Sequence, residues 1–144
     1  MMNQHLYEAL KDSLKMFGIE PFSPVEYQGF QHIVESQIIA IVGLTGNKKG
    51  TITVEFDEGA FDKIVKTLMP GMDVEFSVKL SALSEIANMM SGNFLSRAKL
   101  LGVDITPPTV LVGKNIKAII ANVDTNYVSC SIDDGMIIIG MSFQ

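Results

Sequence analysis

The sequence predicts an α+β fold in which a mostly antiparallel sheet has long helices packed on one face. The first observation is the order of elements: a helix, a pair of strands, two helices and then a run of strands. The second is that short turns separate the successive strands, which implies antiparallel neighbours. Strands and helices do not alternate as they do in parallel nucleotide-binding sheets. Residues 1–144 are long enough for one core and are expected to form a single domain.

The first helix is expected from Asn3 to about Phe17. Its apolar residues recur at spacings of three and four, and Gly18 follows as a stop signal. Two prolines interrupt the next residues. A short strand is then expected at Val25–Phe30.

The next feature is a predicted hairpin. Its two β-rich runs, Ser36–Thr45 and Gly50–Phe56, are joined by the turn-forming loop Gly46–Lys49. The second run alternates apolar with polar residues, namely Ile52, Val54 and Phe56 against Thr51, Thr53 and Glu55. We therefore expect one face of this strand to contact water.

Two helices are predicted after the hairpin. The first covers Glu58–Met69, starts with acidic residues that suit the positive end of the helix dipole, and ends before Pro70. The second begins between Val74 and Lys79, ends near Gly102, and is the longest element expected in the chain. Helical spacing puts its apolar residues on one side, which should be buried: Leu80, Leu83, Ile86, Ala87, Met90, Phe94, Ala98 and Leu101.

The C-terminal part of the chain is expected to be a strand meander. An extended segment at 103–106 leads into Pro107-Pro108. Turn residues at 113–115, 124–125 and 133–135 then separate four predicted strands, Thr109–Val112, Ile116–Val123, Asn126–Ile132 and Met136–Phe143. We interpret Asp133-Asp134 before Gly135 as a hairpin turn and not as a cation site.

Composition narrows the classes of partner. A net charge of −5 and a pI near 4.9 disfavour binding to nucleic acid or to an anionic membrane surface, and favour a protein partner. The hydrophobic fraction of 47% leaves apolar surface for oligomerisation. No signal peptide and no apolar run of about 18 residues is found, so a cytoplasmic location is expected. Cys130 alternates with strand residues and is expected to be a small buried hydrophobe in a reducing compartment.

The long helix also carries an unusual polar side. Ser81, Glu85, Asn88 and Gly92 share one face opposite the apolar residues, and we call them the polar strip. Asn88, Gly92 and the nearby Asn93 are poor helix formers, and such local rule-breaking is typical of functional positions. One alternative is that Glu85 and Asn88 are ordinary exposed residues and that Gly92 lets another helix approach closely.

The chemistry available to the polar strip is positioning. A carboxamide at Asn88 both donates and accepts, so it can hold a water molecule in a fixed direction. Glu85 can accept charge-assisted hydrogen bonds from a lysine or arginine of a partner. No nucleophile pair, phosphate-binding loop or metal motif accompanies them, and His5 and His32 lie far from any cysteine or carboxylate cluster, so no metal site is expected. The strip therefore resembles half of an active site.

The motif Ser81-x3-Glu85-x2-Asn88, continuing as Met89-Met90-Ser91-Gly92-Asn93, resembles the [D/S]-x3-E-x2-N signature of the CheC/CheX/FliY chemotaxis phosphatases. The EIANMMSGN run and the order of elements are most similar to CheX. CheC-like members carry a second such motif, whereas the helix expected at 58–69 has no ExxN, so one site per chain is expected.

The resemblance implies a function. The substrate would be the aspartyl phosphate of a phosphorylated CheY-like response-regulator receiver, Asn88 would orient the attacking water, and Glu85 would pair with the active-site lysine of the receiver. The protein would need no cofactor of its own, because the receiver would supply Mg²⁺. Ser81, Gly92 and Asn93 would support the motif. A homodimer joined through sheet edges is also implied.

Two alternatives remain open. One is a non-catalytic module of the same fold that binds a receiver or a flagellar-switch component. The other is an enzyme acting on a small phosphoester, which the missing metal cluster and phosphate-binding loop disfavour.

Overall fold

The computed structural model describes residues 2–144. Its three helices are α1 (Met2–Lys15), α2 (Glu58–Leu68) and α3 (Phe76–Arg97). Its strands are β1 (Phe22–Gly29), β2 (His32–Gly46), β3 (Gly50–Phe56), β4 (Val103–Ile105), β5 (Thr109–Ala121), β6 (Thr125–Ile132) and β7 (Gly135–Phe143). No helix within residues 2–144 is long and apolar enough to cross a membrane.

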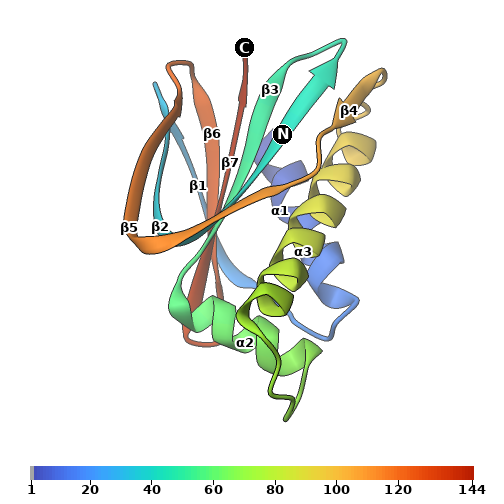
Figure 1. The fold of residues 1–144 in the computed structure, drawn as a ribbon. Coiled ribbons are helices and arrows are strands. Elements are labelled where there is room, and N and C mark those ends of the chain that lie inside the picture. The colour runs from blue at the N-terminus through green and yellow to red at the C-terminus, as the bar shows by residue number, and fades with distance from the viewer. Residues whose placement is uncertain (1) are drawn as a thin grey trace.

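The strands form one seven-stranded antiparallel sheet in the order β1-β6-β7-β3-β2-β4, with β5 also paired to β2. The three helices all lie on the same side of this sheet (Figure 1). Apolar side chains from the helices and from the facing side of the strands form the core, with Phe56 and Phe94 among the largest that are fully buried. The predicted α+β fold with helices on one face is confirmed.

Most local elements follow the sequence prediction. The hairpin of β2 and β3 pairs Leu44 with Gly50 across the predicted loop, and the turn before Gly135 joins β6 to β7. Cys130 is buried, as predicted, and burial raises the pKa of its thiol to about 12, so the thiol stays protonated. The strand predicted at Val25–Phe30 begins earlier, at Phe22, with a bulge between Phe22 and Val25.

The predicted turn at residues 113–115 is wrong. Residues Thr109–Ala121 form a single strand, β5, that pairs with β2 along its length. The register shifts between Ser36 and Ile38 of β2, and Asn115 has a positive φ of 56°. Glycine and asparagine suit a bulge as well as a turn, because both adopt left-handed backbone conformations readily.

The prediction that β3 has one face in water is also wrong. Thr53 and Glu55 are buried, because the first part of β2 bends across the outer face of β3 and β7. The Glu55 carboxylate accepts hydrogen bonds from the backbone N–H of Glu35 and from the hydroxyl of Ser36. A strand that is polar on alternate positions is therefore covered by another segment of the same sheet.

His32 lies at the centre of this covered polar layer. Its Nδ1 and Nε2 atoms each share a 2.7 Å hydrogen bond with a hydroxyl, from Ser142 and Thr53 respectively. A Cβ at position 140 would lie 2.7 Å from His32 Nε2, so Gly140 makes room for the ring. Burial lowers the pKa of His32 from 6.5 to about 4, which keeps the ring neutral in the folded protein.

We expect the free energy of unfolding to decrease as the pH falls from 6.5 to about 4, with His32 contributing a loss of up to about 3 kcal/mol. The unfolded chain takes up a proton at His32 below about pH 6.5, whereas the folded chain does not, so acid favours unfolding. Denaturant titrations across this pH range measure the effect. Burial raises the pKa of Glu55, so Glu55 makes the opposite contribution: it increases the free energy of unfolding as the pH falls.

The variant His32→Gln separates the two contributions, because it keeps Glu55 and removes the imidazole. The unfolding free energy of His32→Gln should depend less steeply on pH than that of the unaltered protein between pH 6.5 and 4. Parallel curves for the two proteins would exclude His32 as the source of acid sensitivity.

Candidate active site on helix α3

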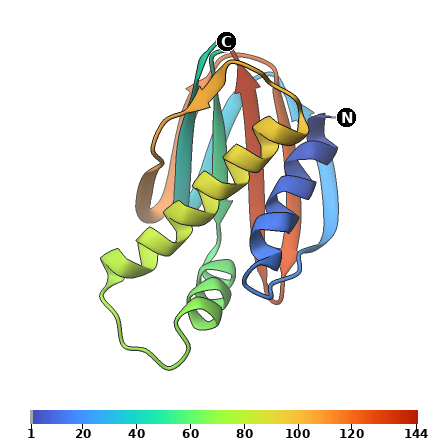
Figure 2. The same cartoon turned by 90° about the vertical axis from the view of Figure 1, so that its right-hand side faces the viewer.

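Helix α3 is held by its buried side. Its buried apolar side chains recur at helical spacing and belong to the core: Leu83, Ile86, Ala87, Met90 and Phe94. Figure 2 shows α3 lying diagonally across the sheet, with α1 beside its C-terminal half. Because one side of α3 is fixed against the sheet, the opposite side, which carries the polar strip, faces away from the core.

Leu101 does not belong to the buried side, contrary to the sequence prediction. Helix α3 ends at Arg97, and Lys99 then adopts a positive φ of 54°. The chain leaves the helical path at that point, so helical spacing no longer describes the residues that follow. The Leu101 side chain is 85% exposed.

Glu85 and Asn88 lie one turn apart on the polar strip, and Glu85 is exposed while Asn88 is half-buried. None of the ion pairs formed by residues 2–144 involves Glu85. The carboxylate is therefore available to a cationic group from outside the chain. Ser81 is exposed too, but its hydroxyl donates a 3.0 Å hydrogen bond to the carbonyl oxygen of Ser77 on the same helix.

Gly92 does not serve as a contact point for another helix of this chain. A Cβ built at position 92 would meet no atom within 4 Å. The alternative that Gly92 permits close helix packing is therefore wrong within the described residues. Its place on α3 leaves an unobstructed surface next to Asn88.

Asn93 faces a different direction from the polar strip. Its Nδ2 donates a 3.0 Å hydrogen bond to the hydroxyl of Ser13 on α1, and that hydroxyl donates to the carbonyl oxygen of Ala9. One turn later, Arg97 pairs with Asp12 of α1. Asn93 therefore joins α3 to α1, which is a structural reason for a poor helix former at this position.

An exposed apolar side chain borders the polar strip and was missed by sequence reasoning. Val78 is 46% exposed and lies seven residues before Glu85, which places it on the same face two turns earlier. The seven-residue spacing between Val78 and Glu85 could have indicated this position from the sequence. The exposed face of α3 thus combines a carboxylate, a carboxamide, an unobstructed glycine and an apolar side chain.

The site contains positioning groups and no reacting group of its own. Within residues 2–144, no cluster of three or more His, Cys, Asp or Glu side chains could hold a metal ion. Glu85 and Asn88 are fixed on a rigid helix and open to solvent, so they can bind a partner's cation and orient a water molecule. Such a face suits chemistry on a group carried by another molecule.

Comparisons with known proteins identify relatives of this chain. A family model described as "Chemotaxis phosphatase CheX" matches residues 38–133. A protein of Thermotoga maritima named "CheY-P phosphatase CheX" is 33% identical over 117 residues, which cover 78% of this chain and 73% of the relative. The matched region includes α3 and its polar strip.

Solved structures have the same fold. A chemotaxis protein CheX from Desulfovibrio desulfuricans superposes with a TM-score of 0.89 at 20% identity, covering 99% of each chain. The CheX–CheY–BeF3–Mg²⁺ complex from Borrelia burgdorferi gives a TM-score of 0.70 at 22% identity, covering 98% of this chain and 96% of that one.

Proposed function

Because the chain belongs to the CheX family of chemotaxis phosphatases, we propose that it removes the phosphoryl group from a CheY-like response-regulator receiver. The observation that carries the proposal is the pair Glu85 and Asn88, one turn apart on the solvent side of a helix anchored in the core. The name of the Thermotoga relative and the CheY bound to the Borrelia CheX support the same partner.

In the proposed mechanism, Asn88 holds the attacking water. Its carbonyl oxygen accepts a hydrogen bond from the water, which directs the lone pair of the water oxygen at the phosphorus atom. The bond between phosphorus and the aspartyl oxygen breaks as the water oxygen bonds to phosphorus, giving inorganic phosphate and the free aspartate of the receiver. The receiver would hold Mg²⁺, which would supply positive charge to the phosphoryl oxygens.

Glu85 has a docking role in this proposal. Its carboxylate, which forms no ion pair with any of residues 2–144, accepts a charge-assisted hydrogen bond from the active-site lysine of the receiver, and this bond places α3 along the phosphorylated site. Val78 adds apolar contact on the same face. The proposal assigns Ser81 no contact with the receiver; its hydroxyl donates to the carbonyl oxygen of Ser77, which leaves the oxygen free only as an acceptor.

We also propose that residues 1–144 act as one domain, form a homodimer and work in the cytoplasm with the receiver. Strand β5 supports the dimer, because it lies beside β2 with its other edge unpaired within residues 2–144 and exposes Val112 and Ile119. A second copy could pair with that edge and cover those side chains. Sedimentation of the purified protein over a range of concentrations would measure this association.

The proposed activity is tested by mixing the purified protein with each phosphorylated receiver domain of its host. Loss of the phosphoryl group, followed with radiolabelled phosphate, should accelerate for at least one receiver. A receiver that binds without faster loss of phosphate would favour the non-catalytic binding module. No acceleration with any receiver would contradict the phosphatase proposal.

The variant Gly92→Ala tests whether Gly92 lies in the surface that docks the receiver or is an ordinary exposed helix position. The new methyl group meets nothing within the chain, so alanine should stabilise the free protein by up to about 1 kcal/mol. The same methyl group would project toward a docked receiver, and kcat/KM for dephosphorylation should fall about tenfold. Denaturant titration and the phosphate assay measure the two effects. A stabilised variant with unchanged kcat/KM would show that the receiver does not approach Gly92.

A further inference from the structure

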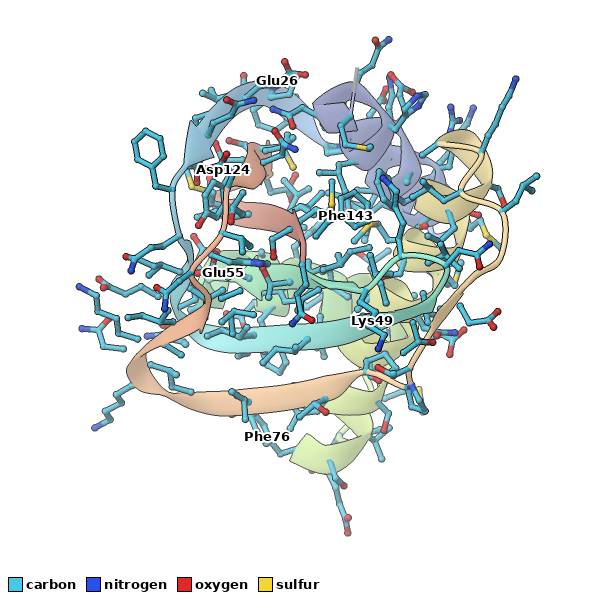
Figure 3. All side chains as sticks on the ribbon, turned by 90° about the horizontal axis from the view of Figure 1, so that it is seen from above. Glu26, Lys49, Glu55, Phe76, Asp124 and Phe143 are labelled. Carbon is cyan, nitrogen blue, oxygen red and sulfur yellow. The ribbon has the colours of Figure 1, made fainter. Side chains whose placement is uncertain are left out.

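A second concave site lies among the strands and is independent of the proposed phosphatase activity. It is a pocket of about 550 Å³, a volume within the range of small-molecule sites. Its walls come from β1, β2, β3, β6 and β7 and include Tyr27, Phe30, Ile33, Glu35, Glu55, Tyr127 and Ile138. Figure 3 labels Glu55 among the strands, away from the C-terminal half of α3.

Glu55 contributes a carboxyl group to the lining of this pocket. The residue is 4% exposed. Its Oε1 atom accepts hydrogen bonds from the Glu35 N–H at 2.7 Å and from the Ser36 hydroxyl at 2.9 Å, whereas neither bond reaches Oε2. No ion pair among residues 2–144 involves Glu55. Burial raises the pKa of Glu55 because it disfavours the charged form, so a positively charged ligand at Oε2 would offset the cost of the charge.

Two aromatic rings also line the pocket. The rings of Tyr27 and Tyr127 stack with their centroids 4.9 Å apart and an angle of 11° between planes. The Tyr127 hydroxyl donates to the carbonyl oxygen of Gln31 and accepts from the N–H of Ile33, which holds the ring in place. An exposed aromatic face attracts cations, and in this stack Tyr27 is the exposed ring while Tyr127 is buried behind it. The exposed ring of Phe30 adds a further apolar surface.

The rim of the pocket adds negative charge. The Glu35 side chain is half exposed, and its Oε2 lies 3.6 Å from Lys117 Nζ. Because both side chains contact solvent, this ion pair is weak. Glu55 and Glu35 together do not make a metal centre, because no group of three such ligands occurs within the described residues. The pocket is thus lined by one buried carboxyl group, one carboxylate at its rim and two stacked tyrosine rings.

We propose that this pocket binds a small organic ammonium ion, with the charged nitrogen at Glu55 Oε2 and the apolar part of the ligand against Tyr27 and Tyr127. The carboxylate supplies charge and the rings supply both cation–π attraction and apolar contact. The size of the pocket suits a compact amine with an aromatic or branched aliphatic body.

The test uses the full chain and two probes of similar shape, the 2-phenylethylammonium ion and neutral 2-phenylethanol. Titration followed by amide NMR should give saturable shifts around Tyr27, Ile33, Glu55 and Tyr127 with the cation, and at least about tenfold weaker binding of the alcohol. Free methylammonium, which has the charge without the ring, should bind more weakly than 2-phenylethylammonium. Absence of saturable binding, or equal binding of the alcohol, would overturn the proposal.

Two variants decide whether the named residues carry the binding. Glu55→Gln keeps the shape and the two hydrogen bonds to Oε1, and should weaken binding of the cation at least about tenfold without affecting the alcohol. Tyr27→Leu, on the exposed side of the stack, should weaken both probes and serves if Glu55→Gln does not fold. Asn88→Ala, on α3, should leave the titration unchanged. Unaltered affinity in Tyr27→Leu or in folded Glu55→Gln would overturn the proposal.

Discussion

Asn88→Ala is expected to slow dephosphorylation of the receiver by at least about 100-fold in kcat, because it removes the group that directs the attacking water. The side chain is half-buried on the solvent side of α3 and is not among the buried residues of that helix, so the fold should persist. Single-turnover loss of phosphate at saturating protein measures the chemical step. Glu85→Gln should instead raise KM, since it removes the charge that docks the receiver.

Asn93→Ala is the matched control on the same helix. Asn93 carries the same carboxamide group, but its Nδ2 donates a hydrogen bond to Ser13 of α1. Loss of this hydrogen bond should lower the free energy of unfolding by about 1 kcal/mol and leave kcat unchanged. If Asn88→Ala and Asn93→Ala slowed dephosphorylation equally, the water-positioning role of Asn88 would be wrong. If Asn88→Ala lost stability and kept full activity, the residue would be structural.

Phe94→Ala is expected to lower the free energy of unfolding by about 3–5 kcal/mol. The Phe94 ring is fully buried in the core formed by α3, α1 and the sheet, and its removal leaves a cavity that rigid neighbours fill only in part. Urea titration at pH 7 measures the loss as a lower midpoint with an unchanged slope.

Leu101→Ala provides the contrast. Helical spacing puts Leu101 on the same side as Phe94, yet its side chain is 85% exposed, so the change in unfolding free energy should stay within about 0.5 kcal/mol. A loss at Leu101 close to that at Phe94 would mean that Leu101 is covered in solution, for example by a second copy of the chain.

Local patterns were sufficient for much of the architecture. Apolar spacing predicted α1 and α3, and the loop at 46–49 predicted the β2–β3 hairpin, because these features depend on residues close in sequence. The same reasoning located the pair Glu85 and Asn88 on the solvent side of α3. That part of the candidate site is predictable because one helix contains both residues.

The tertiary structure decided the features that depend on contacts between distant segments. The alternation of apolar and polar residues in β3 predicted one face exposed to solvent. The bend in β2 instead brings His32 and Ser36 over Thr53 and Glu55. Asn93 donates a hydrogen bond to Ser13 of the first helix, a contact between segments that are far apart in the sequence. The pocket at Glu55 draws its walls from five strands, and no local pattern indicates it.

By itself, the sequence determined the type and order of the elements and the surface that carries Glu85 and Asn88, since periodicity depends on backbone geometry within a few residues. Only the tertiary structure decided which polar side chains are covered, which amide joins helices and where the second pocket lies. Those properties depend on which remote segment packs against each residue, and hydrophobic periodicity does not specify which segment that is.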